Sequence, residues 1–364
     1  MTLLVGTASW TDKTLLACGR FYPPDVTTPE ARLRFYASQF PLVEVDSSYY
    51  AMPSAATAQL WAERTPPRFV FDVKAFRLFT GHRTEAKALH ADLRGALGAN
   101  VKSLYWRGTP AEVRDELWRR FVAALAPLHS AGKLGLVHFQ FAPWLVADRA
   151  GHDHVRHCIE RMAEAGLASS VEFRHFSWFD GEERRERTLA FLRELGAAHT
   201  VVDGPQGHDN SVPAIWTATQ PQRALVRLHG RNAEAWGLAG ATVAERFDYE
   251  YAESELAALA GDVRRLADEA EEVHVVFNNC NEDAAQRNAR TLLRLLDAMA
   301  GTSAKDGDGD DDPPPNEPVI PDLDACCGQG CEPCVFDLFE ESRQRHREAL
   351  RDWEARQAAR KNGG

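Results

Sequence analysis

Eight short apolar runs recur along the first 300 residues of the chain, and segments with helix signals separate most of them. The runs cover residues 3–10, 42–46, 68–74, 133–141, 169–175, 198–204, 224–230 and 272–279. Thr28 before Pro29 marks one helix start, and Thr109 with Glu112 forms a capping-box pattern at another. Repeated alternation of strand and helix predicts a closed (β/α)8 barrel of the TIM type over residues 1–300. An open doubly wound sheet is the alternative, although no GxGxxG follows the first strand.

Charged and amide side chains interrupt the apolar runs at alternating positions. Alternate residues of a strand face opposite sides of the sheet, and the outer side of a barrel is apolar because helices cover it. The polar residues should therefore point into the barrel, toward the carboxyl ends of the strands, where barrel enzymes hold their active sites. This inward set comprises Glu44, Asp46, Asp72, Lys74, His138, Gln140, Glu172, Arg174, Asp203, Arg227, His229 and Asn278.

Two interpretations of the inward set are open. Its acids and bases could simply neutralise one another in a buried network that supports the fold. Buried ion pairs add uncertain net stability, however, and apolar side chains fill a barrel well, so we favour an active site. Glu172 is then the expected general acid or base, and His229 the expected proton shuttle. The residues expected to stabilise anionic charge are Lys74, Arg174 and Arg227.

The loops that follow the strands carry further side chains suited to binding. Aromatic faces over a polar floor suit a sugar ring or a base, and the expected rim aromatics are Trp10, Tyr49, Tyr50, Phe79, Trp144, Trp178 and Trp236. The rim groups that could hold a phosphate or carboxylate are His82, Arg83, Arg231, Asn232 and Asn279. We predict a small polar ligand, bound by Glu44, Asp46, His82, Arg83, Gln140, Trp178, Asp203, Arg231, Asn278 and Asn279.

A metal in the barrel has little support from residue spacing. A divalent ion could in principle be held by Asp46, His138, Glu172, Asp203 and His229. The strands contain no HExxH or HxH pattern that would place two ligands on one face. We therefore expect the barrel to work without a metal or other cofactor.

The charge distribution bears on partners. The chain has a net charge of −11, but residues 301–364 hold 15 acids and 8 bases, whereas the first 300 residues hold 38 acids and 34 bases. A nearly neutral barrel argues against non-specific nucleic-acid binding, which needs an excess of Lys and Arg. No apolar run is long enough to cross a membrane, and the opening MTLLVGTASW lacks the basic flank of a signal peptide. We expect a cytoplasmic protein.

The last part of the chain has a different character. Residues 301–324 are acidic and proline-rich, a composition that predicts a solvated linker. Residues 325–364 form a short module whose cysteines are Cys326, Cys327, Cys331 and Cys334. Four sulfurs within nine residues suit a zinc site or an iron–sulfur cluster, and equally a labile disulfide pair. Zinc is the first expectation, because so small a module needs a cross-link to fold.

Several segments resemble known families. GTASW, VEVDSSYYAMPS, FVFDVKAF, GLVHFQFAPW, SVEFRHFSWF, VRLHGRN and VFNN occur in the order of the DUF72 (YecE-like) family, so residues 1–300 resemble that family. The resemblance implies a (β/α)8 barrel, carries no established activity, and includes a distant likeness to barrel endonucleases. ACCGQGCEPCVFDLFEE resembles the oxidoreductase-like module, for which the resemblance implies no demonstrated catalysis.

Two classes of function follow from these observations. The first is a metal-independent acid–base enzyme, a hydrolase or isomerase, acting on a small polar substrate that is phosphorylated or sugar-like. Hydride transfer fits less well, because no nucleotide-binding motif is present. The alternative is a platform that binds nucleic acid or protein, or a metal-dependent nuclease-like barrel. In that alternative the cysteine module would serve as an interaction or redox element, and it could contact a protein partner.

Overall fold

The computed structural model describes residues 1–303, except for 99, 209, 237, 239 and 241, together with a few isolated positions between 343 and 353. Contacts divide the chain into two compact units, Met1–Met299 and Ala300–Gly364. The four cysteines predicted to bind metal, and nearly all of the predicted linker, lie outside the described residues.

Eight parallel strands close into a barrel, which confirms the predicted fold and rules out the open sheet. Around the barrel the order is β1, β2, β3, β6, β7, β8, β9 and β10, and β10 pairs with β1. The strands are β1 Thr2–Ala8, β2 Leu42–Val45, β3 Val70–Lys74, β6 Leu134–Gln140, β7 Ser169–Glu172, β8 Ala198–Asp203, β9 Arg223–Leu228 and β10 Glu272–Phe277. Each lies within, or one residue outside, one of the eight apolar runs.

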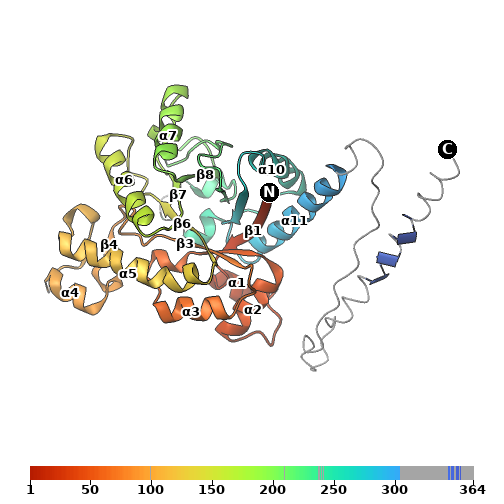
Figure 1. Ribbon diagram of the computed structural model, residues 1–364, viewed down its shortest axis with the longest axis horizontal. Coiled ribbons are helices and arrows are strands. Elements are labelled where there is room, and N and C mark those ends of the chain that lie inside the picture. The colour runs from red at the N-terminus through yellow and green to blue at the C-terminus, as the bar shows by residue number, and fades with distance from the viewer. Residues whose placement is uncertain are drawn as a thin grey trace. The chain divides into compact units, whose positions relative to one another are not determined.

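Helices surround the strands, as Figure 1 shows. They are α1 Lys13–Cys18, α2 Pro29–Gln39, α3 Ala55–Glu63, α4 Ala91–Leu97, α5 Ala111–Ser130, α6 Arg149–Glu164, α7 Glu182–Glu194, α8 Ala233–Trp236, α9 Val243–Arg246, α10 Glu253–Leu266 and α11 Ala284–Ser303. Short 3-10 turns follow several strands: η1 Ser47–Tyr49, η2 Ala86–Ala88, η3 Trp106–Gly108 and η4 Phe176–Trp178. In the described part of the chain, no helix combines the length and apolar character needed to span a bilayer.

The connection between β8 and β9 departs from the expected alternation. No helix occurs among its described residues, 204–208 and 210–222. The segment contains Pro205, Pro213 and Pro221, and each proline removes a backbone donor and clashes with a preceding helical turn. These prolines therefore explain why the described part of the connection between β8 and β9 is coil.

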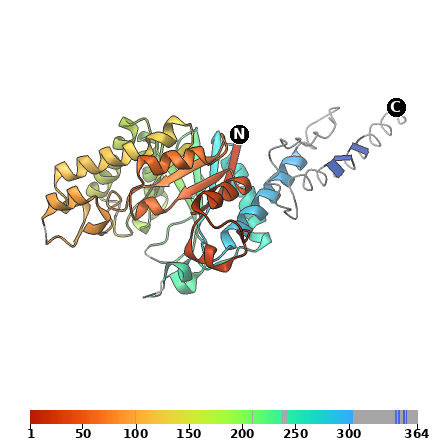
Figure 2. The ribbon, with the colours of Figure 1, turned by 90° about the horizontal axis from the view of Figure 1, so that it is seen from below.

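The long connection after β3 carries its own small sheet. β4 Thr84–Glu85 and β5 Ser103–Leu104 pair antiparallel. This insertion is tied to the barrel because Arg120 on α5 donates a 3.0 Å hydrogen bond to Asp92 on α4. Figure 2 shows the insertion, in orange, beside α5 at the edge of the barrel. A surface cavity of about 460 Å³ lies between η3, α5 and α6, and another of about 590 Å³ lies on the insertion; none of the inward set lines them.

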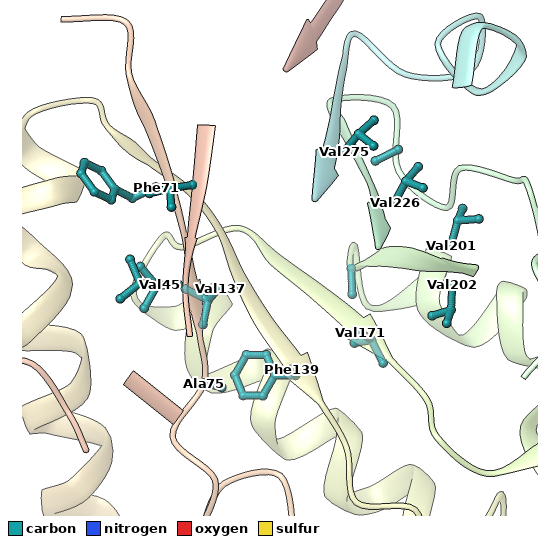
Figure 3. Close-up of a cluster of buried hydrophobic side chains, with 14 of the residues drawn as sticks. Val45, Phe71, Ala75, Val137, Phe139, Val171, Val201, Val202, Val226 and Val275 are labelled. Carbon is teal, nitrogen blue, oxygen red and sulfur yellow. The ribbon is translucent and has the colours of Figure 1, made fainter. Parts of the chain in front are cut away.

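The main apolar core lies between the strands and the helices. Outward side chains of every strand contribute to it, and Figure 3 shows Val171, Val201, Val226 and Val275 projecting from four strands. Inside the barrel a second, smaller apolar cluster contains Leu4, Ala8, Leu42, Leu136, Leu225 and Val276. The interior is thus apolar in part, and the remaining inward positions hold the charged residues described below.

Within the barrel, Asp72 and His274 form a buried ion pair. His274 Nδ1 lies 2.9 Å from Asp72 Oδ2, and its Nε2 lies 2.9 Å from Glu272 Oε1. Gly135 leaves room for the pair, because an added Cβ would come within 2.4 Å of an Asp72 oxygen. Burial alone would lower the pKa of His274, but Asp72 and Glu272 outweigh it and raise that pKa to about 9.

Replacing His274 by glutamine should change how stability depends on pH. The folded-state pKa of about 9 exceeds the ordinary 6.5, so the pairing contributes fully below pH 6.5 and is lost as pH rises through about 9. That difference corresponds to about 3 kcal/mol. Urea unfolding between pH 6 and pH 10 should show the loss in the wild type and not in His274→Gln. His90→Gln, at an exposed position, is the control and should behave as the wild type. An unchanged pH profile in His274→Gln would contradict this assignment.

Candidate active site

Glu172 lies at the centre of a buried ion network at the carboxyl end of the barrel. Arg227 Nη1 donates to Glu172 Oε2 at 2.6 Å, and Arg227 Nη2 donates to Glu44 Oε1 at 2.7 Å. All three side chains are fully buried. Gln140 accepts a further bond from Arg227 at 3.1 Å. The strand register brings these residues together, because β7, β9 and β2 all present alternate residues to the interior.

Glu172 remains ionised across the physiological range. Burial alone would raise the pKa of its carboxyl, but Arg227 and His229 outweigh burial and hold that pKa well below its usual value. Arg174 Nη1 contributes a longer contact of 3.4 Å. A carboxylate held in this state cannot donate a proton, so the expected role of Glu172 as general acid does not fit the geometry.

His229 forms a dyad with Glu172. Its Nε2 lies 3.2 Å from Glu172 Oε1, and its Nδ1 lies 2.8 Å from Asn278 Nδ2. Because an ionised carboxylate only accepts hydrogen bonds, Nε2 carries the ring proton and Nδ1 carries the lone pair. Asn278, at the end of β10, donates to that lone pair. Glu172 therefore fixes the tautomer that leaves Nδ1 as the basic atom, much as a carboxylate orients the histidine of a catalytic triad.

His229 is a neutral imidazole at pH 7. Burial lowers its pKa to about 4, and the charges of Arg227 and Arg174 act in the same direction, while Glu172 opposes them. The rings of Trp236 and Phe247 lie against the imidazole, with centroids 6.2 and 5.6 Å away. These aromatic side chains, from the β9–α10 connection, help to bury the imidazole, which is fully buried.

Lys74 and Asp46 form a second pair nearer the mouth. Lys74 Nζ donates to Asp46 Oδ1 at 2.7 Å, and the two side chains are 10% and 28% exposed. Burial favours the neutral forms, but the mutual attraction prevails, so the pKa of Lys74 is raised and that of Asp46 is lowered. Both groups are therefore charged at neutral pH, and Lys74 keeps donors for a ligand.

His82 also lies at this end of the barrel, beside Tyr49 and Trp144. Its ring centroid is 5.3 Å from that of Tyr49 and 5.5 Å from that of Trp144. Burial, reinforced by Lys74, lowers the pKa of His82 to about 3. The structure thus gathers Glu44, Asp46, Lys74, His82, Gln140, Glu172, Arg174, Arg227, His229 and Asn278 at one end of the barrel.

Asp203 and Arg231 do not belong to this group. The register pairs Val202 with Arg227 and Asp203 with Leu228, so Asp203 faces outward with the apolar residue. There it accepts bonds from Arg231 Nη2 at 2.8 Å and from the Tyr251 hydroxyl at 2.6 Å. The expectation that Asp203 points into the barrel is wrong by one position of strand alternation. Its pair with Arg231 fastens the β9–α10 connection to the barrel.

Three other predicted binding residues also lie elsewhere. Asn279 is buried outside the strands, where its amide donates to Tyr249 O and to Asn288 Oδ1 on α11. Trp178 does not lie at the rim, because it is fully buried and stacks on Phe173 at 3.9 Å. Arg83 is exposed on the insertion and donates to Ser103. The rim aromatic Phe79 is likewise a core residue.

Two neighbours of the site had been given no catalytic or substrate-binding role. His138 points at Glu172, with 3.4 Å between Nε2 and Oε2 but without the alignment of a hydrogen bond, and its Nδ1 lies 3.0 Å from Ser170 Oγ. Strand alternation had placed it inward. Arg77 follows the end of β3, where no alternation rule applies, and only the neighbouring tyrosine pair could have pointed to it. Among the described residues, no three His, Cys, Asp or Glu side chains group so as to hold a metal ion.

The fold is a closed parallel barrel, and a buried ion network lies beneath its carboxyl-end loops. Barrels of this class hold small-molecule sites at that end. The chain belongs to the family described as "Protein of unknown function DUF72", which matches residues 4–311. Residues 312–357 match "Oxidoreductase-like protein, N-terminal". These matches confirm both resemblances seen in the sequence.

Named relatives support the same assignment. The chain is similar to UPF0759 protein YunF of Bacillus subtilis, with 32% identity over 298 residues, covering 81% of this chain and 95% of that protein. A DUF72 family protein of Enterococcus faecalis matches with a TM-score of 0.66 and 26% identity, over 81% of this chain and 96% of the other. One from Thermotoga maritima matches with a TM-score of 0.62 and 29% identity, over 82% and 100%.

Proposed function

We propose that the carboxyl end of the barrel is the active site of an acid–base enzyme, a hydrolase or isomerase, for a small polar substrate that is phosphorylated or sugar-like. The observation that carries the proposal is the Glu172–His229 dyad, in which an ionised carboxylate holds a neutral imidazole whose Nδ1 lone pair accepts from Asn278. A network serving only to fill the barrel would not need a histidine in a defined tautomer.

The dyad can take a proton from a substrate. In the proposed step, Asn278 is replaced as the donor to His229 Nδ1 by a substrate hydroxyl, an activated substrate C–H or a bound water. This donor then transfers its proton to Nδ1. The resulting imidazolium is stabilised by Glu172, 3.2 Å from Nε2. Glu172 thus acts as a positioning residue, and His229 is the general base.

The surrounding cations link substrate charge to this step. Arg174 lowers the pKa of His229 through its positive charge. An anionic substrate that neutralises Arg174 would therefore raise the basicity of His229 when it binds. The same cations would stabilise negative charge that develops on the substrate. An anionic substrate is in this way favoured over a neutral one.

A turnover screen tests the proposal. The full-length protein is incubated with phosphomonoesters, phosphodiesters, glycosides and sugar phosphates, and hydrolysis or solvent-deuterium incorporation is followed by NMR. We expect conversion of at least one anionic class without added metal. Absence of conversion across the panel, with and without divalent ions, would count against an enzyme.

A binding platform for nucleic acid or protein is the second candidate. Large apolar side chains are exposed on loops that follow the strands: Tyr50 50%, Trp144 55%, Phe176 44% and Leu238 60%. Exposed aromatic groups around one end of a domain are typical of interaction surfaces. In this reading the charged interior supports the fold and the rim makes the contact.

We further propose a structural zinc ion at Cys326, Cys327, Cys331 and Cys334, from the donor set alone, since tetrahedral thiolate coordination suits Zn²⁺. Elemental analysis of the purified full-length protein should give about one zinc per chain. Replacing Cys331 and Cys334 together by serine should remove it, whereas replacing Cys18 should not. Loss of zinc in the Cys18 variant, or iron in place of zinc, would contradict the proposal.

A further inference from the structure

Three cationic side chains surround Tyr49 and His82 at the mouth. Lys74 Nζ lies 4.9 Å from the Tyr49 ring centroid, and the Arg77 guanidinium carbon lies 5.2 Å from it. Burial and the positive charges of Lys74, Arg77 and Arg174 lower the pKa of His82, and the Arg174 guanidinium carbon lies 5.0 Å from the Trp236 ring centroid. The three come from the end of β3, the loop after it and the residues just after β7.

One of these cations, Arg77, is not neutralised by a carboxylate within the described residues. Lys74 pairs with Asp46 at 2.7 Å, whereas Arg174 shares Glu172 with Arg227, at 3.4 Å, and lies over the Trp236 ring. Arg77 forms no ion pair and no side-chain hydrogen bond within the described residues, and its buried Nε has no partner there. A buried donor without a partner costs free energy unless a ligand or a water molecule accepts its hydrogen bond. Arg77 therefore has the charge and the donors to pair with an anion.

Two neutral groups could also contact a partly protonated phosphoryl group. Thr80 Oγ1 donates to Arg77 O at 3.1 Å, so it must accept from His82 Nδ1–H at 2.9 Å. His82 Nε2 then carries a lone pair, which can accept a hydrogen bond from a P–OH group but not from an ionised phosphate oxygen. Tyr49, 9% exposed, makes no hydrogen bond through its hydroxyl within the described residues, so this donor is also available.

We propose that Lys74, Arg77, Arg174, Tyr49 and His82 form a phosphate subsite, which binds the phosphoryl group of a small phosphorylated substrate. Several donors approaching from different directions suit a tetrahedral oxyanion better than a planar carboxylate. The inference deepens the proposed function and rests on it: the phosphoryl group would lie at this subsite while the reacting atom lies at His229.

Calorimetric titration of the full-length protein with inorganic phosphate tests the subsite, with acetate as the planar comparison. Phosphate should bind more tightly than acetate, and Arg77→Gln should raise the phosphate Kd at least about tenfold, the usual effect of losing a charged hydrogen bond. Tyr49→Phe should raise it several-fold while keeping the fold, which circular dichroism verifies. Arg83→Gln, at an exposed arginine on the same insertion, is the matched control and should bind as the wild type.

The outcomes separate the subsite from the proposed function. No phosphate binding by the wild type, or equal weakening in Arg77→Gln and Arg83→Gln, would overturn the subsite even if the turnover screen succeeds. Phosphate binding that Arg77→Gln and Tyr49→Phe both weaken would support the subsite even if the screen finds no conversion. Equal affinity for acetate and phosphate would overturn the assignment to a phosphoryl group.

Discussion

Arg227→Met is expected to lower the free energy of unfolding by about 3–5 kcal/mol, the usual effect of breaking a buried ion pair by removing one partner. Arg227 is fully buried and bonds to both Glu44 and Glu172. Methionine fills much of the same space but leaves two buried carboxylates without their cation. The Glu172 carboxyl, whose pKa Arg227 lowers, should then take up a proton more readily, so the loss should be smaller at pH 5 than at pH 7. Urea unfolding at both pH values measures this loss of stability.

Arg223→Met supplies the matched control. Arg223 lies four residues earlier on β9, its side chain is 34% exposed, and it pairs with Glu272 at 2.9 Å. A partly exposed pair contributes about 1 kcal/mol or less, so this variant should be nearly as stable as the wild type. Equal destabilisation of the two variants would show that the buried network stabilises the fold no more than a partly exposed ion pair does.

His229→Gln is expected to reduce kcat about 10²–10⁴-fold on the substrate found by screening, the usual contribution of general acid–base catalysis. Glutamine can still bond to Glu172, so binding of substrate should change only a few-fold. In the wild type, the rate should fall only as pH drops toward about 4, because the low pKa keeps His229 neutral above that value. Steady-state rates from pH 4 to pH 8 test both points.

His152→Gln serves as the control for this variant. His152 lies on α6, where its ring packs against Trp178 and Phe191 and makes none of the contacts of the dyad. Its rates should match those of the wild type. If His229→Gln retains more than a tenth of the wild-type kcat, His229 is not the general base.

Apolar runs were sufficient to predict the barrel because strand burial in a parallel sheet leaves a strong local pattern. Helix starts were less predictable. Thr28 caps α2 as the sequence indicated, accepting from Ala31 N, whereas α5 begins after Pro110 and Thr109 instead bonds to Tyr105 O. The capping-box pattern failed there because the Thr109 hydroxyl donates to Tyr105 O and the helix starts one residue later.

The candidate site was predictable only where strand alternation applies. Glu44, Glu172 and Arg227 follow that rule and meet inside the barrel. Asp203, the last residue of its strand, was misplaced because register, which alternation alone does not define, turns it outward. Loop residues such as Arg77 were missed, since their position depends on tertiary packing against Tyr49 rather than on any local period.

The protonation state of His229 is the most direct test of the proposed Glu172–His229 dyad, because a base requires an unprotonated Nδ1. Ring-nitrogen NMR spectra of ¹⁵N-labelled protein at pH 7, assigned with His229→Gln and His274→Gln, measure it without any substrate. We expect a neutral His229 with its proton on Nε2, and a doubly protonated His274 in the same spectrum. A positively charged His229, or a neutral ring with its proton on Nδ1, would contradict the proposed dyad.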